Sequence, residues 1–242
     1  MAATLRTDIG KLRKQNEDAA WFDESRAVFA VADGMGGHLA GEVASRMAIE
    51  AVQRMAKEND VPGIAALRDA VAGAHETILA HAQSHIECAG MGTTLSVLWL
   101  SRSYAYIAHV GDSRIYRLRA GSLSQITQDH SLVEELVRAG LVTREQARTH
   151  PRRNIITRAL GTHGENEPDL LVTDVQDGDV FLLCTDGLTG MVTDVQIERI
   201  LLENDMEAAA DALLAAALDA GGRDNVTLIL CERRGASAWN RD

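Results

Sequence analysis

With 242 residues, 46% of them hydrophobic and 24% charged, the chain falls in the range of one large soluble globular domain. Its formal net charge of −11 is opposite in sign to that expected of a protein that binds nucleic acid or an anionic membrane, and fits either a cation site or a solvated surface. The N-terminus lacks an apolar signal region and no apolar run approaches about 20 residues, so we expect a cytoplasmic protein with no membrane span.

The first elements along the chain are two short β-type segments, Ala19–Phe22 and Val28–Ala32. The second stops at Asp33 and is followed by a glycine-rich turn, which predicts a carboxylate at the rim of a sheet. Apolar residues then recur at helical spacing over 40–55 and again over 64–78. We therefore predict two helices after the second strand.

The rest of the chain alternates between β-type and helical patterns. Five β-type segments lie at 94–100, 104–110, 114–118, 180–184 and 226–231. Residues 128–154 are polar and helix-forming, with a candidate capping box at Thr143–Gln146, and predict a helical insertion or flap. A second capping box at Thr193–Gln196 begins a predicted helix. The Ala- and Leu-rich segment 207–220 predicts another helix.

Four aspartates stand where predicted strands begin or end: Asp33, Asp112, Asp186 and Asp224. If these strands are neighbours, the carboxylates meet at one sheet edge, where they must hold protons or cations. Oxygen ligands without thiolates favour Mg²⁺ or Mn²⁺, and two such ions about 4 Å apart can clamp a phosphoryl group. Asp-Gly is also common turn chemistry, so spacing alone leaves a turn-only interpretation open.

Eight short motifs occur in a characteristic order along nearly the whole chain. They are R-K-Q-N-E-D at 13–18, V-A-D-G-M-G-G-H at 31–38, G-M-G-T-T-L at 90–95, H-V-G-D-S-R at 109–114, Q-D-H-S-L-V at 128–133, T-R-A-L-G at 157–161, C-T-D-G-L at 184–188 and G-G-R-D-N-V-T at 221–227. In these motifs the chain resembles the metal-dependent protein phosphatase (PPM) family, the type 2C Ser/Thr phosphatases, in its compact bacterial form. The resemblance implies a single α+β domain over 1–242. Its fold would be a four-layer α-β-β-α sandwich: a central antiparallel β-sandwich flanked by helix pairs, with a small helical flap at about 128–154.

The resemblance also implies a set of metal ligands. Asp33 would bridge two Mn²⁺ or Mg²⁺ ions, and Gly34 would offer its carbonyl to one of them. Asp186 and Asp224 would complete the coordination of the second ion. Asp112, together with Asp186, would hold a third and more weakly bound ion.

Four further residues are expected around these ligands. Glu17 would hold metal-bound water, with Asp18 nearby, and Asn225 would lie beside the site. Arg13 would grip the substrate phosphate, because a guanidinium fork matches pairs of phosphate oxygens. These roles are carried over from the family pattern.

The function implied by the resemblance is hydrolysis of phosphoserine and phosphothreonine in proteins by hydroxide bridging two metal ions. Arg13, Asp33 and Asp186 would be the catalytic residues. The expected partners are phosphorylated proteins, a Ser/Thr kinase and its substrates among them, so that the enzyme reverses bacterial kinase signalling. We expect a monomer, since no exposed apolar repeat is evident.

The residue at the position of the general acid differs from that in the eukaryotic branch of the family. There a histidine directly follows the Asp-Gly pair, whereas this chain has Met35. His38 is the candidate replacement, and a solvent-facing histidine at a helix start is the alternative. The protonating group could also be metal-bound water.

Other features have a structural and a functional interpretation. In the flap, His150, Arg152 and Arg153 are either surface charges or attract a phosphopeptide. Cys184 lies within an apolar run and is expected to pack there as a reduced thiol, as are the other two cysteines.

Two alternative functions stay open on the sequence. One is a non-catalytic relative that binds phosphoproteins or a kinase as an adaptor; the presence of every expected metal ligand argues against it. The other is nucleotide binding, suggested by a strand, Gly34-x-Gly36 and a helix. The third glycine position of that fingerprint holds Leu39, and Asp33 would place a negatively charged carboxylate next to a pyrophosphate.

Overall fold

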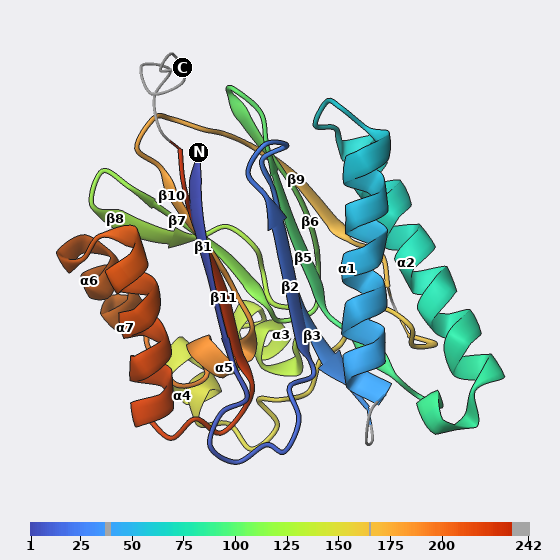
Figure 1. Ribbon diagram of the computed structural model, residues 1–242. Helices are drawn as coiled ribbons and strands as arrows, with labels where there is room; N and C mark the ends of the chain where they lie inside the picture. Colours follow the sequence, from blue (N-terminus) through green and yellow to red (C-terminus); the bar gives the residue numbers. More distant parts are fainter. Residues whose placement is uncertain (37–39, 165, 234–242) are drawn as a thin grey trace.

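A computed structural model describes residues 1–36, 40–164 and 166–233. It has four layers, with two antiparallel β-sheets packed face to face between two pairs of helices (Figure 1). All strand pairs are antiparallel. The predicted α-β-β-α sandwich is therefore confirmed.

The first sheet has the strand order β2-β3-β5-β6-β9, with β4 paired to β3. Its strands are β2 (Asp18–Asp23), β3 (Val28–Met35), β4 (Gly92–Thr93), β5 (Leu95–Leu100), β6 (Tyr104–Val110) and β9 (Asp169–Asp174). The second sheet has the order β1-β11-β10-β7-β8. Its strands are β1 (Ala2–Asp8), β7 (Arg114–Arg119), β8 (Ser122–Gln125), β10 (Val180–Cys184) and β11 (Val226–Glu232).

Helices cover the outer face of each sheet. On the first sheet lie α1 (Ala40–Glu58) and α2 (Ile64–Ser84), followed by the short 3₁₀ helix η1 (Ile86–Cys88). On the second lie α6 (Asp194–Glu203) and α7 (Met206–Asp219), with the one-turn helix α5 (Asp186–Thr189). The capping box at Thr193 and Gln196 begins α6 as predicted.

Alternation along the strands explains the layers. In β3, Val28 and Ala30 pack against the helices while Phe29 and Val31 face the opposite sheet. Successive side chains of a strand point to opposite faces, so a strand buried on both sides is apolar throughout. Three cores result: one between the two sheets and one beneath each pair of helices.

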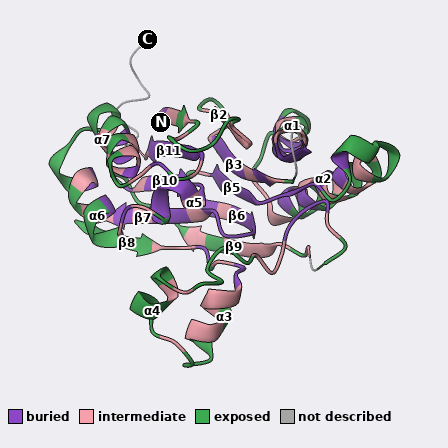
Figure 2. Ribbon diagram, turned by 90° about the horizontal axis from the view of Figure 1, so that it is seen from below, coloured by how far each residue is buried: buried purple, intermediate pink, exposed green. Residues whose placement is uncertain are grey.

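The flap is formed by α3 (Leu132–Arg138) and α4 (Arg144–Arg148), within the predicted insertion. Figure 2 shows these helices projecting away from the sandwich, with no fully buried residue in either. The two ends of the flap are joined, because the Leu132 amide donates to the Ile155 carbonyl at 2.9 Å. A capping box at Thr143 and Gln146 begins α4, as predicted.

The structure corrects several predicted boundaries. The prediction assigned no strand to the segments that form β1, β8 and β9, each at an edge of a sheet. It ended the second strand at Ala32, but β3 continues to Met35 because Gly34 and Met35 pair with β4. Asp33 is therefore held inside a strand.

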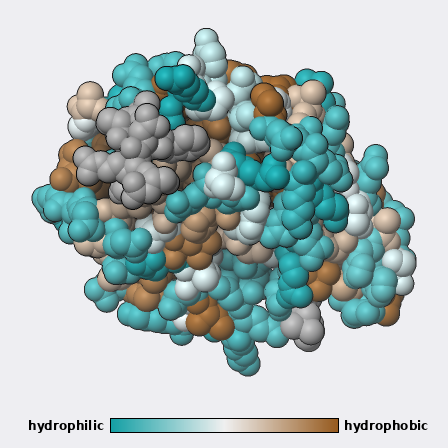
Figure 3. Space-filling view, turned by 45° about the horizontal axis from the view of Figure 1, so that its top comes forward, coloured by the Kyte–Doolittle hydropathy of each residue, from teal (hydrophilic) through white to brown (hydrophobic). Residues whose placement is uncertain are grey.

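Hydrophilic residues cover much of the molecular surface in the view of Figure 3. On the face shown in Figure 3, apolar residues lie in small groups separated by hydrophilic ones. Every helix within residues 1–36, 40–164 and 166–233 is too short or too polar to cross a membrane. The three cysteines are buried and form no disulfide.

Candidate metal centre

A cleft of about 520 Å³ lies where loops from both sheets meet. Its acidic lining comes from distant parts of the sequence: Glu17, Asp33, Asp112, Asp186 and Asp224. Asp33 belongs to β3 of the first sheet, whereas Asp186 follows β10 and Asp224 precedes β11 in the second. The strand-end acids thus gather at one rim, as the sequence predicted.

Hydroxyl groups fix the backbone of Asp33. Its amide donates to Thr94 Oγ1 at 2.9 Å, and its carbonyl accepts from Thr93 Oγ1 at 2.9 Å. The Thr94 hydroxyl also lies 2.8 Å from Ser113 Oγ, beside Asp112. These hydroxyl residues stand inside two of the recognised motifs, but the sequence analysis gave them no role. Their bonds leave the Asp33 carboxylate free to face the cleft.

Gly34 lies where three segments of backbone come close together. Its amide donates to the Glu17 carbonyl at 3.2 Å. A Cβ at this position would overlap the carbonyl oxygen of Gly41 and lie 2.6 Å from that of Glu17. A side chain is therefore excluded, and the backbone of Gly34 forms part of the cleft wall.

Asn225 organises the loop that carries Arg13 and Glu17. Its Oδ1 accepts from the Glu17 amide at 2.8 Å, and its Nδ2 donates to the carbonyls of Ile9 and Gln15 at 2.9 and 2.8 Å. All the polar atoms of this buried amide side chain are thereby used. Arg13 reaches into the cleft and donates to Asp224 Oδ2 at 2.7 Å.

The carboxylates are poorly accommodated as anions. Burial, followed by the charges of neighbouring aspartates, raises the pKa of Asp33 well above its ordinary value. Burial likewise raises the pKa of Asp18 to about 7 and that of Asp186 to about 6, with Asp224 adding to the latter. Burial and the charge of Asp186 raise the pKa of Asp112. The cleft therefore favours protonation or the binding of cations.

The donors present suit hard divalent ions. In the described part of the chain, the buried Oδ1 atoms of Asp18 and Asp112 have no hydrogen-bond partner. The acidic lining offers carboxylate oxygens and includes no Cys or His, a set that favours Mg²⁺ or Mn²⁺. Across residues 1–36, 40–164 and 166–233, no three Asp, Glu, His or Cys side chains already stand in the arrangement that holds one ion. Asp224 pairs with Arg13.

The structure brings together nearly all the predicted site residues. The cleft is lined by Arg13, Glu17, Asp33, Gly34, Asp112, Asp186 and Asp224. Asp18 pairs with Asp33 across β2 and β3, and one of its oxygens accepts from Thr185 Oγ1 at 2.9 Å. Asn225 holds the loop that carries Glu17 by accepting a hydrogen bond from the Glu17 amide. The candidate general acid, His38, lies outside the described residues.

Comparisons with known proteins agree with this geometry. The Protein phosphatase 2C family profile matches residues 11–225. The Ser/Thr phosphatase Stp of Listeria welshimeri is 42% identical over 242 residues, covering 96% of this chain and 96% of that protein. The crystal structure of Mycobacterium tuberculosis PstP superposes with a TM-score of 0.91 at 38% identity, covering 97% of this chain and 99% of that one. The PstP catalytic domain in complex with two manganese ions gives 0.88 at 38% identity, covering 97% and 98%.

The fold, the acid-lined cleft and these relatives together define a metal-dependent Ser/Thr protein phosphatase. The chain belongs to the protein phosphatase 2C family. The family predicted from the eight sequence motifs is thereby confirmed.

Proposed function

We propose that the chain hydrolyses phosphoserine and phosphothreonine in proteins, using two divalent ions held in the cleft between the sheets. The convergence of Asp33, Asp186 and Asp224 from both sheets at one rim carries this proposal. The PstP catalytic domain, which shares the fold, is described in complex with two manganese ions. Manganese or magnesium would suit this oxygen donor set.

Several of the cleft residues have a proposed role in holding the ions. Asp33 would bridge the ions, the carbonyl of Gly34 would face one, and Asp186 and Asp224 would hold the other. Glu17 would act through a bound water, with Asp18 close by. When bound, such ions lower the pKa of a water molecule to supply hydroxide and neutralise phosphoryl oxygens.

Arg13 is suited to orienting the phosphate. Its guanidinium now donates to Asp224 at 2.7 Å and remains about half exposed at the cleft. A cation sharing the charge of Asp224 would weaken this pairing and leave the planar donors of Arg13 available to phosphate oxygens. We propose a third, weaker ion at Asp112 and Asp186, where a buried Asp112 oxygen lacks a partner among the described residues.

The proposed cellular role is to reverse phosphorylation by a Ser/Thr kinase in the cytoplasm, as a single-domain monomer. The relatives named as Ser/Thr phosphatases support the substrate class. His38 stays a prediction for the general acid.

Phosphate release from a phosphothreonine peptide tests the proposed reaction. Activity should vanish in EDTA, return with Mn²⁺, and be lost in Asp33→Ala. Asp69→Ala, on the exposed side of α2, removes the same charge outside the cleft and should keep full activity. Wild-type rates in Asp33→Ala at saturating Mn²⁺ would contradict the mechanism. Tight phosphopeptide binding without hydrolysis would favour an adaptor.

A further inference from the structure

A second pocket, of about 280 Å³, lies between the flap and helices α5 and α6. Its flap side includes Val133, Val137, Arg144, Arg148 and Arg153, and its other side includes Thr189, Thr193 and Val195. Asp112, Asn154 and Asp186 line both this pocket and the metal cleft. The pocket therefore begins where the cleft ends, so a peptide held at the cleft can extend into it.

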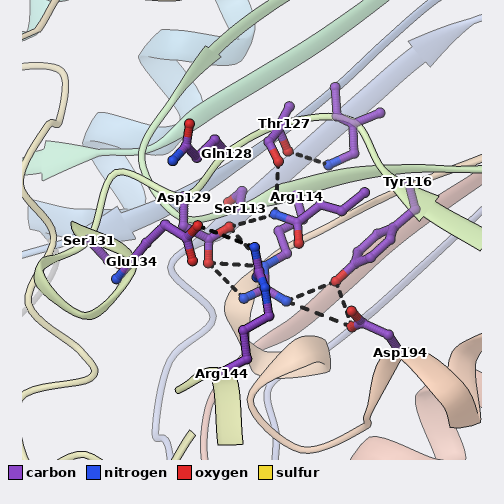
Figure 4. A network of polar contacts seen from close by, with 12 residues as sticks. Ser113, Arg114, Tyr116, Thr127, Gln128, Asp129, Ser131, Glu134, Arg144 and Asp194 are labelled. Carbon is purple, nitrogen blue, oxygen red and sulfur yellow. Dashed lines mark hydrogen bonds and ion pairs between the residues drawn. The ribbon is translucent and has the colours of Figure 1, made fainter. Parts of the chain in front are cut away.

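Half of the charged side chains that line this pocket are already paired with one another. Figure 4 shows the Arg114 guanidinium between Asp129, which it contacts with two nitrogens, and the Tyr116 hydroxyl. Tyr116 in turn donates to Asp194 at 3.0 Å. One guanidinium thus faces two carboxylates, and these groups form a polar floor that keeps a net negative charge.

The flap contributes another internal pair. Arg144 lies 3.5 Å from Glu134, whose amide is bonded to the Ser131 hydroxyl at the start of α3. Glu145 stands in the first turn of α4, where hydrogen bonds to its own backbone amide and to Thr143 lower its pKa. Glu134 is therefore paired with Arg144, whereas Glu145 stays ionised and forms no ion pair with an arginine in the described part of the chain.

Two cations of the pocket have no such partner. Within the described part of the chain, the guanidinium groups of Arg148 and Arg153 form no hydrogen bond or ion pair. Both are exposed and come from the flap, one at the end of α4 and one beyond it. By contrast, Arg152 is exposed but does not line the pocket, and the His150 ring accepts from the Arg152 amide at 3.1 Å. The basic residues of the flap therefore differ in where they lie.

We propose that Arg148 and Arg153 form a subsite for an anionic side chain of the substrate, close in sequence to the phosphoresidue being hydrolysed. The ligand class is a peptide segment with a carboxylate or a second phosphorylated residue. Guanidinium groups bind both through paired oxygens, and the neighbouring valines accept the apolar part of the chain. This inference rests on the proposed function, since it assumes a phosphopeptide in the cleft.

Steady-state kinetics on matched phosphothreonine peptides tests the subsite. The flanking positions carry Gln in a neutral peptide, Glu in a second, phosphothreonine in a third and Lys in a fourth, scanned on either side of the scissile residue. In the wild type, kcat/KM should rank the two anionic peptides above the neutral one and the Lys peptide below it. The effect should be in KM, because the contact is present before and during the reaction.

The double variant Arg148→Ala/Arg153→Ala should lose this ranking. We expect the ratio of kcat/KM for the Glu peptide over the Gln peptide to fall from about fivefold toward one, the size of a few exposed charge contacts. Added salt should reduce the ratio in the wild type and leave it unchanged in the double variant. Arg152→Ala, the matched control, should keep both the ratio and the salt dependence.

Three results would overturn the subsite. They are a wild type indifferent to flanking charge, a double variant that keeps the ranking, and an Arg152→Ala variant that loses it equally. Hydrolysis of the neutral peptide by wild type with Mn²⁺ measures the proposed function separately, so failure of the subsite is distinguishable from failure of the reaction. Thermal unfolding of all variants checks that the flap substitutions leave the fold intact.

Discussion

At the scale of single residues, Asp33 and Gly34 meet opposite requirements at adjacent positions of one strand. Asp33 lines the cleft, and its backbone donates to the Thr94 hydroxyl and accepts from the Thr93 hydroxyl. Gly34 must present no side chain, because the backbone of Gly41 and Glu17 occupies that space. The conformation of β3 at these two positions is therefore set by the segments packed on either side of it.

Gly34→Ala should damage both stability and activity. The added Cβ overlaps the Gly41 carbonyl, so the strand or α1 must shift, at a cost of about 1–3 kcal/mol. We expect Tm to fall by about 2–10 °C, measured by thermal unfolding, and phosphatase activity to fall with it.

Gly73→Ala provides the matched control for this change. Gly73 lies within α2, and a Cβ there meets nothing within 4 Å. The same substitution should stabilise that helix by about 0.5–1 kcal/mol and leave activity unaltered. A Gly34→Ala protein as stable and active as Gly73→Ala would contradict the argument from crowding.

At the scale of elements, the same capping motif begins two helices with different surroundings. Thr193 caps α6, which buries Ile197 and Leu201 in the core beneath the second sheet. Thr143 caps α4 of the flap, which buries no residue. The local geometry is alike, so the consequence of losing a cap depends on how each helix is packed.

Thr193→Ala and Thr143→Ala should therefore differ in their effect. Loss of the α6 cap should cost about 1 kcal/mol and lower Tm by about 2–4 °C. Loss of the α4 cap should leave Tm unchanged but speed amide hydrogen exchange in the flap, because the flap opens without unfolding the sandwich. Equal drops in Tm would show instead that the flap unfolds together with the core.

At the scale of the whole molecule, the fold gathers more buried acid than it can stabilise without cations. Aspartates from both sheets share one rim, and burial raises the pKa of several of them. Folding without metal therefore favours bound protons at this rim. Divalent ions would replace those protons, so we expect metal binding and folding to be coupled.

This coupling predicts how stability depends on pH. Asp18, with a pKa raised to about 7, binds more protons in the native than in the unfolded state, so the free energy of unfolding falls as pH rises through 7. The buried His109 and His130, whose pKa burial lowers, are neutral in both states above about pH 7 and do not oppose this trend.

The Tm of the metal-free protein should accordingly decrease between about pH 6.5 and 7.5, as followed by calorimetry. Mn²⁺ at about a hundred times its dissociation constant should raise Tm by roughly 5–10 °C, more at the higher pH. Asp33→Asn, which removes one of the crowded charges, should show a shallower decline. A metal-free Tm that rises over this range would be inconsistent with raised acid pKa values.

The residue patterns by themselves determined the inner elements and the chemistry of the cleft. Strands such as β3, β5 and β10 are buried on both faces, so their apolar runs stand out in the sequence. Acids in or next to β3, β10 and β11, together with the order of the eight motifs, are sufficient to predict the family from the sequence. The site is predictable to this extent because its residues lie at fixed places along those strands.

Tertiary structure alone decided the rest. The segments that form β1, β8 and β9 carry mixed polar and apolar residues with little full burial, and become strands only because β11, β7 and β6 offer hydrogen-bonding edges. The Asp33 strand runs on to Met35 because β4, distant in sequence, pairs with it. The separation of Arg148 and Arg153 from Arg152 likewise depends on how the flap is placed beside α5 and α6. Partners remote along the chain set each of these features, and local sequence carries no record of them.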